Sequence, residues 1–274
     1  VKIHFPKGWY PRFQELEYVR AFLFGRMAWS QINGLLLVSG GLGMFDKEIA
    51  IEAGGYWHKS LGEDMELVTR MRKYMYDNKI PFSIQYVPES LCWTEVPATK
   101  KVLIRQRVRW SRGLVQTLNL HKNIFLNPKY GRTAFVIFPY FFFFEFLIPI
   151  LEVIGVIILI LGLFILEVNY HNFFYLVFTV YLFYITLTFV SILLDEVIYK
   201  NYANTKEIVI LVCMAIIEPF CYHPVNVYAS LKGYYHFFKQ KEQKWGDMQR
   251  QGFSNPTENR NNKSLTTNEN LKSV

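Results

Sequence analysis

The first half of the chain alternates between two hydrophobic periods. Apolar side chains at near-helical spacing predict helices over residues 14–31 and 64–78. The continuous apolar run 35–39 and the alternating segment 82–87 each predict a strand. A basic helix is expected from Pro97, which suits a first helical position, to about residue 120. Strands that alternate with helices indicate an α/β layer.

Long apolar blocks replace this pattern in the second half. Residues 134–166 exceed the roughly 20 residues that a membrane span needs. Residues 173–194 form a second block, which carries no charge. A third block, 208–231, contains Glu218 and His223, each followed by proline, so we expect it to be broken or re-entrant. The pattern predicts an all-α transmembrane region after the α/β layer.

Composition and charge support two unlike parts. Of the 274 residues, 51% are hydrophobic and 19% are charged, which excludes a disordered or collagen-like chain. The net charge is +8, yet Lys200 and Lys206 are the only basic residues between positions 133 and 231. Basic flanks around apolar spans are typical of the cytoplasmic face of a membrane. Because no single element concentrates the basic charge, we expect no nucleic-acid partner.

These patterns divide the chain into three parts. We expect a soluble part over residues 1–132, transmembrane and interfacial helices over 133–240, and a basic, largely disordered cytoplasmic tail over 241–274. The protein would then be a multi-pass protein of the cell membrane, in contact with membrane lipid, with its soluble part in the cytoplasm. Three simple spans would place the tail outside, so one block is not expected to be a simple span. The sequence leaves open which block that is.

Two short motifs carry the candidate chemistry, and the first is Gly62-Glu63-Asp64 at an expected helix start. An acidic pair in this position is usually a cap that the helix dipole stabilises. The same field favours an ionised carboxylate, which is the form that a general base needs. Both interpretations stay open on this motif alone.

The second motif is QRVRW at positions 106–110. On a helix, the i, i+3, i+4, i+7 spacing gives one face to Gln106, Arg109, Trp110 and Gly113. Arginine holds phosphate groups by forked hydrogen bonds, and an indole offers a flat apolar face to a sugar ring. The alternative is a basic amphipathic helix on an anionic membrane surface.

Together, GED, QRVRW about 40 residues later and the apolar blocks resemble the processive family 2 glycosyltransferases, which include cellulose, chitin, hyaluronan and poly-N-acetylglucosamine synthases. Residues 37–45 and 52–56 look like the segment beside the family's acceptor site, and residues 87–97 like its approach to the basic helix. The resemblance covers roughly residues 14–250. It implies an α/β fold class: a partial GT-A-like catalytic domain followed by an all-α transmembrane region.

The resemblance also implies a role for each motif residue. Asp64 would deprotonate the acceptor hydroxyl, which attacks the anomeric carbon of a nucleotide sugar with inversion, and Glu63 would support that carboxylate. Trp110 would stack under the acceptor sugar, and Gly40 and Gly41 would line the same acceptor site. The residues expected on the donor diphosphate are Gln106, Arg107 and Arg109.

The chain departs from the family's pattern on the donor side. Family members bind the nucleotide and a divalent metal in an N-terminal half with an acidic D-x-D-type site, and none of the five aspartates here forms D-x-D. We therefore expect no metal ligands in this chain, although Mg²⁺ or Mn²⁺ is expected in the complete enzyme. The expected partners are a nucleotide sugar, by family prior a UDP-sugar, and a glycan acceptor. Three explanations of this departure stay open: the chain is a fragment of a longer synthase and inactive alone, another chain supplies the missing half, or the protein is inactive. The fragment is the main expectation.

The main hypothesis is thus a membrane-bound inverting hexosyltransferase that extends a polysaccharide or a lipid-linked glycan. Two other functions stay open. A membrane transporter or channel subunit would use Glu218 and His223 as an intramembrane site. A catalytically dead membrane scaffold would lose nothing on Asp64→Asn.

Overall fold

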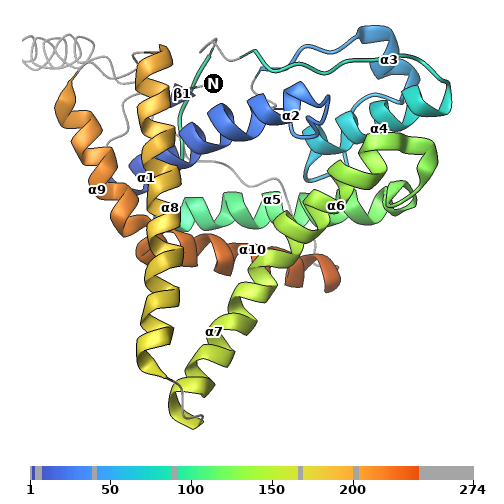
Figure 1. Cartoon of the computed structure of the whole chain (residues 1–274). Coiled ribbons are helices and arrows are strands. Elements are labelled where there is room, and N and C mark those ends of the chain that lie inside the picture. The colour runs from blue at the N-terminus through green and yellow to red at the C-terminus, as the bar shows by residue number, and fades with distance from the viewer. Residues whose placement is uncertain are drawn as a thin grey trace, which may run out of the picture. The chain divides into compact units, whose positions relative to one another are not determined.

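The computed structural model describes residues 2–3, 8–38, 42–87, 92–165, 169–199 and 204–240. Most of these residues are helical (Figure 1). The helices are α1 (Trp9–Val19), α2 (Met27–Gln31), α3 (Lys47–Glu52), α4 (Glu63–Asp77), α5 (Lys100–Leu120), α6 (Phe138–Tyr140), α7 (Ile148–Ile165), α8 (Tyr170–Tyr199), α9 (Thr205–Cys221) and α10 (His223–Phe238). A π-helical segment, Arg20–Arg26, joins α1 to α2, and two more, Thr133–Ile137 and Phe141–Leu147, flank α6.

The expected α/β fold class is wrong. Among the described residues, the strands are only β1 (Lys2–Ile3) and β2 (Trp93–Thr94), which pair in parallel with Lys2 opposite Trp93. Helices make up nearly all the regular structure, in the part expected to be α/β as well as in the apolar half.

The two segments expected to be strands pair with no strand in the described part of the chain. Side chains from neighbouring elements bind their backbones instead. The backbone N–H of Ile84 donates to Oδ1 of Asn33 at 2.8 Å, and that of Tyr86 donates to Oγ of Ser30 at 2.9 Å. Burial along residues 82–87 does alternate as expected. The alternation therefore reports which side chains are covered, whereas a strand also needs a neighbouring ladder of backbone groups.

The expected helices are confirmed, with shifted ends. Helical structure runs from Trp9 to Gln31, and α4 begins at Glu63. Helix α5 begins at Lys100 rather than Pro97, because Thr99 caps it by accepting from the N–H of Val102.

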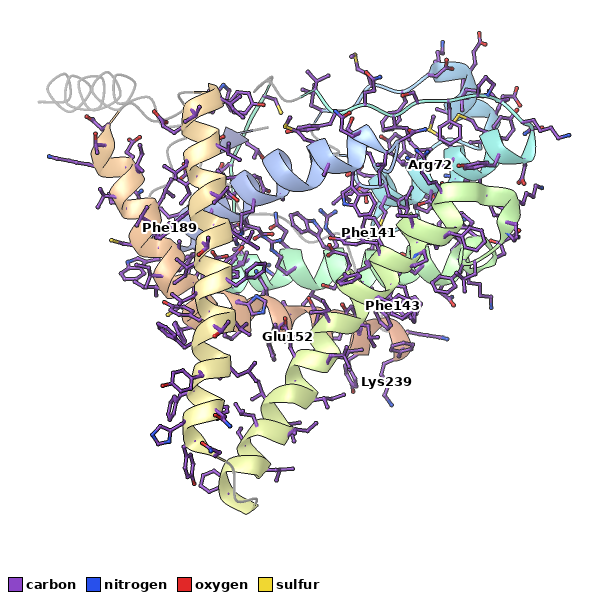
Figure 2. All side chains as sticks on the ribbon, viewed as in Figure 1. Arg72, Phe141, Phe143, Glu152, Phe189 and Lys239 are labelled. Atoms are coloured by element: carbon purple, nitrogen blue, oxygen red, sulfur yellow. The ribbon has the colours of Figure 1, made fainter. Side chains whose placement is uncertain are left out.

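A core lies under α4. Met65 and Val68 of α4 pack there against Ala134, Ile137 and other buried side chains of the segment that leads into α6. Arg72 extends from α4 into the same region, and its guanidinium donates to the carbonyl of Leu35 (Figure 2). This core fixes α4 against the start of the apolar half.

Two helical segments are long and apolar enough to cross a membrane. They are Thr133–Gly162, which contains α6 and most of α7, and α8. Large apolar side chains on both are exposed, such as Ile158 and Phe183, as expected for a surface that faces lipid. Helices α9 and α10 pass the same test only as a pair, bent by 46° at their junction. The described residues therefore contain two candidate spans, or three if the pair is one span. The expected interruption of the third block is confirmed.

Helix α10 runs alongside α5 (Figure 1). Gly233 permits the contact, because a Cβ there would lie 2.8 Å from the carbonyl oxygen of Val108. Ser111 and Ser230 meet across the same contact, with their Oγ atoms 3.2 Å apart. The third apolar block therefore packs on the basic helix. The domain boundaries at 132 and 240 stay a prediction.

A largely buried ion pair joins the π-helical segment after α1 to the apolar half. The guanidinium of Arg20 binds both carboxylate oxygens of Glu218 on α9 and donates to Oγ1 of Thr188 on α8 at 3.1 Å. The Glu218 side chain is 3% exposed. Glu218 was one of the two residues behind the transporter alternative, together with His223, and this pair explains the burial of Glu218 as a contact within the protein.

Glu218→Ala is expected to destabilise the protein by about 3 kcal/mol, because it leaves the Arg20 charge partly buried without a partner. The measurement is the thermal unfolding midpoint in detergent. Glu207→Ala, in the partly exposed first turn of the same helix, is the control and should change the midpoint little. Equal midpoints for the two variants would contradict a stabilising role of the pair.

Candidate active site

Two glycines bring the two sequence motifs into contact. A Cβ on Gly113 of α5 would lie 2.7 Å from the backbone nitrogen of Gly62, and a Cβ on Gly62 would lie 3.2 Å from Cα of Gly113. Side chains do not tolerate the first distance, so the backbone before α4 can approach α5 this closely only because position 113 is glycine. Gly62 directly precedes Glu63 and Asp64. The contact therefore places the acidic start of α4 on the QRVRW helix.

Gln116 fixes the loop that leads to α4. Its Oε1 accepts from the N–H of Leu61 at 3.1 Å, and its Nε2 donates to the carbonyl of Lys59 at 3.1 Å. The N–H of Gly62 donates to Oγ of Ser60 at 3.3 Å. Sequence reasoning missed Gln116, although it follows Gly113 by three residues and so continues the same helix face.

Glu63, the first residue of the acidic pair, lies near Arg109. Nη1 of Arg109 lies 3.9 Å from Oε1 of Glu63, and about a quarter of each side chain is exposed. Such a long, partly exposed pair contributes little to stability. Glu63 and Asp64 also lie in the first turn of α4, where the positive end of the helix dipole favours ionised carboxylates. The structure thus brings two acidic candidates and one basic candidate into one place.

Tyr56 lies beside the same carboxylates. Partial burial, together with the negative charges of Asp64 and Glu63, raises the pKa of its phenol. Its side chain remains exposed. The segment that contains Tyr56 was expected near the acceptor, but Tyr56 itself was not among the candidate residues.

Trp110 presents an accessible indole on α5. Its side chain is 39% exposed, and the guanidinium carbon of Arg107 lies 4.4 Å from the centre of its ring system. This distance is that of a cation–π contact. One side of the indole is therefore occupied by Arg107, and the exposed part is available to a sugar ring.

Arg107 is paired with a carboxylate of another helix. Its two terminal nitrogens bind the two carboxylate oxygens of Glu17 on α1 at 2.6 and 2.7 Å, and one also donates to the hydroxyl of Tyr222 at 3.0 Å. Burial alone would lower the pKa of Arg107, but the Glu17 carboxylate and the Tyr222 hydroxyl act against it, and the net effect is a raised pKa. Arg107 is one of the three residues expected on the donor diphosphate. In the structure, a carboxylate of the protein binds both of its terminal nitrogens.

Gln106 is buried, and its Oε1 has no hydrogen-bond partner in the described part of the protein. An unsatisfied buried acceptor costs about 1–3 kcal/mol. A hydroxyl or N–H from a bound molecule would remove that cost.

The predicted acceptor residues Gly40 and Gly41 lie outside the described residues.

The described residues do not bring together three or more His, Cys, Asp or Glu side chains that could hold a metal ion. The Mg²⁺ or Mn²⁺ of the complete enzyme stays an expectation from the family resemblance.

Glu66 connects α4 to the segments packed against it. Its carboxylate is 1% exposed, accepts two hydrogen bonds from Arg70 and lies 3.2 Å from Nε2 of His121, which follows α5. Arg70 also donates to the carbonyls of Ala53 and Gly55, in the turn that precedes Tyr56. The cluster therefore joins α4, the end of α5 and the Tyr56 segment.

The pH dependence of stability should reveal this cluster. Burial alone would raise the pKa of Glu66, but hydrogen bonds from His121 and Arg70 outweigh it and hold that pKa below its usual 4.5. A lowered pKa stabilises the fold above the unfolded value, and this contribution is lost as the pH falls through the folded value. We expect the unfolding midpoint of the wild type to fall more steeply below about pH 4.5 than that of Glu66→Gln. Parallel curves for the two proteins would contradict the contribution of Glu66.

Comparison with known proteins identifies the family of this chain. The family model described as glycosyl transferase family group 2 matches residues 6–194. Because the match covers more than half of the chain, the chain belongs to this family. The resemblance to family 2 glycosyltransferases that the motifs indicated is confirmed.

Two kinds of relative are similar to part of the chain. The probable glycosyltransferase YdaM of Bacillus subtilis (strain 168) is 36% identical over 101 residues, which cover 37% of this chain and 22% of YdaM. The poly-β-1,6-N-acetyl-D-glucosamine synthase of Staphylococcus epidermidis is 30% identical over 103 residues, which cover 37% of this chain and 23% of the synthase. The chain therefore aligns with less than a quarter of the length of each relative. No solved structure matches the chain.

Proposed function

We propose that this chain forms the acceptor side of a membrane-bound inverting glycosyltransferase. It would act on a growing polysaccharide or lipid-linked glycan at the cytoplasmic face of the cell membrane, with a nucleotide sugar as donor. Family membership supports sugar transfer, and the two candidate spans support a membrane location. The named synthase among the relatives supports a polysaccharide as product.

One observation carries the proposal: the contact between Gly62 and Gly113. The contact holds the acidic start of α4 against α5, the helix that exposes Trp110, and Glu63 lies 3.9 Å from Arg109. A base, a cation and a flat apolar surface are the parts that sugar transfer to a hydroxyl needs. Neither motif alone distinguished a site from a helix cap or a membrane-surface helix.

The proposed reaction is a single displacement. The Asp64 carboxylate takes the proton of the acceptor hydroxyl as the hydroxyl oxygen forms a bond to the anomeric carbon. The bond from that carbon to the diphosphate oxygen breaks, and the electron pair leaves with the nucleoside diphosphate. Arg109 stabilises the negative charge that develops there, and Glu63 supports the Asp64 carboxylate. Trp110 supports the acceptor ring.

The proposal is tested by donor turnover in nanodiscs. This chain and the full reading frame that encodes it are each incubated with a panel of UDP-sugars and Mg²⁺ or Mn²⁺. Release of UDP together with polymer or glycolipid formation by the full protein is expected, and the donor that is consumed identifies the sugar. Failure of the full protein to turn over any donor, with or without added acceptor, would contradict the proposal.

The membrane orientation makes a separate prediction. Because α10 runs alongside α5, we expect Lys239 at its end to lie on the catalytic side, and His171, beyond the first span, on the other side. A membrane-impermeant thiol reagent should label Lys239→Cys and Glu48→Cys from the same side of sealed vesicles, and His171→Cys from the opposite side. A background without native cysteines is needed. Labelling of positions 171 and 239 from one side would contradict this orientation.

A further inference from the structure

A buried triad connects the QRVRW helix to two other parts of the fold. Glu17 comes from α1, Arg107 from α5 and Tyr222 from the junction of α9 and α10. Glu17 binds both terminal nitrogens of Arg107, and the Tyr222 hydroxyl contacts Arg107 at 3.0 Å and donates to Glu17. Both terminal nitrogens of the guanidinium are thus held, so its plane is fixed by groups outside α5.

The fixed guanidinium supports Trp110. Its central carbon lies 4.4 Å from the centre of the indole. Arg107 and Trp110 are three residues apart on one helix, so they are neighbours on its surface. The orientation of the indole therefore depends on a guanidinium whose own position is set by Glu17.

We propose that Glu17 is a positioning residue for sugar transfer, which orients Trp110 by holding Arg107 in place beneath it. The proposal rests on the proposed function, because it assigns Trp110 to the acceptor. Tyr222 takes part by closing the triad, and it connects the indole to the bend between α9 and α10. Glu17 touches neither the acidic pair nor the proposed substrates, so its effect is on acceptor placement and not on the chemical step.

A neighbouring ion pair separates positioning from simple stabilisation. Arg20 follows Glu17 by three residues on the same helical segment and binds Glu218 with the same two-oxygen geometry. That pair lies between α1, α8 and α9 and includes no residue of α5. Glu17→Gln and Glu218→Gln each weaken one arginine–carboxylate pair, but only the first pair lies next to Trp110.

The test uses the full protein in nanodiscs and compares these two variants. Both are expected to lower the unfolding midpoint. Glu17→Gln is expected to raise the KM for a short glycan acceptor about tenfold, as expected when one cation–π support is lost, with donor affinity unchanged. Glu218→Gln should leave the acceptor KM unchanged. Tyr222→Phe should also raise the acceptor KM, but by less than Glu17→Gln. This variant tests the triad if Glu17→Gln fails to fold.

A double variant completes the test. If Glu17 acts through the indole, Glu17→Gln should add little to the acceptor KM of Trp110→Ala. Additive effects, or equal changes of acceptor KM in Glu17→Gln and Glu218→Gln, would overturn the proposal. Asp64→Asn in the same series separates the two proposals. A full transfer rate in Asp64→Asn contradicts the proposed function. If Asp64→Asn is inactive but Glu17→Gln and Glu218→Gln have the same acceptor KM, only the role of Glu17 is contradicted.

Discussion

Asp64→Asn in the full protein is expected to lower sugar transfer by about 10²- to 10⁴-fold, the range that a positioned general base contributes. The amide has nearly the size of the carboxylate but cannot accept the proton of the acceptor hydroxyl. Asp64 lies in the first turn of α4, whose start is fixed by backbone contacts of Gly62 and Leu61 with α5. We therefore expect the helix and donor affinity to survive the substitution. Product formation and equilibrium donor binding are the two measurements.

Asp46→Asn is the matched control for this variant. Asp46 also lies at a helix start, where its Oδ1 accepts from the N–H of Ile49 to cap α3. Asparagine caps helices about as well as aspartate, so the control should retain its transfer rate. Retention of most of the rate in Asp64→Asn would remove Asp64 as the base. Equal loss of donor binding and of rate would instead indicate a structural role.

Gly113→Ala is expected to lower transfer by roughly 100-fold, because small displacements of catalytic groups have effects of that size. In an ordinary helix interior, alanine is about 1 kcal/mol more favourable than glycine. At this position the new Cβ would lie 2.7 Å from the nitrogen of Gly62, so the start of α4 must move away from α5. The acidic pair would move with it. Transfer rate and thermal midpoint are measured together.

Gly25→Ala is the control, because a Cβ at that position would meet no atom within 4 Å. It tests the same chemical change in a helical segment of the same protein. A Gly113→Ala enzyme as active as Gly25→Ala would show that the glycine contact does not set the geometry of the site.

Local patterns predicted the helices well because a helix satisfies its own backbone. The apolar spacing that predicted a helix over residues 64–78 corresponds to α4, and the basic helix corresponds to α5. Residues 82–87 show why the strands were wrong. Their burial alternates, but Asn33 and Ser30 supply the hydrogen bonds that a neighbouring strand would supply. A strand depends on a partner that a local pattern does not contain.

The candidate site was predictable in its parts but not in its contacts. GED and QRVRW indicated the acidic pair and the aromatic surface, and Gly113 was already placed on the same face as Trp110. The orientation of Arg107 was not predictable, because its partner Glu17 lies 90 residues earlier in the chain. Gln116 was missed for a similar reason: it acts on a loop that is distant in sequence. Such pairings depend on tertiary packing.

The central claim is that the start of α4 and the exposed face of α5 form one site. The most direct test is a cross-link between Glu63→Cys and Arg109→Cys, in a full protein whose native cysteines, including Cys92, Cys213 and Cys221, are replaced by serine. A short bifunctional thiol reagent should join the two new cysteines within one chain, and each single-cysteine variant is the control. The claim is contradicted if both cysteines react with a monofunctional reagent but no cross-link forms.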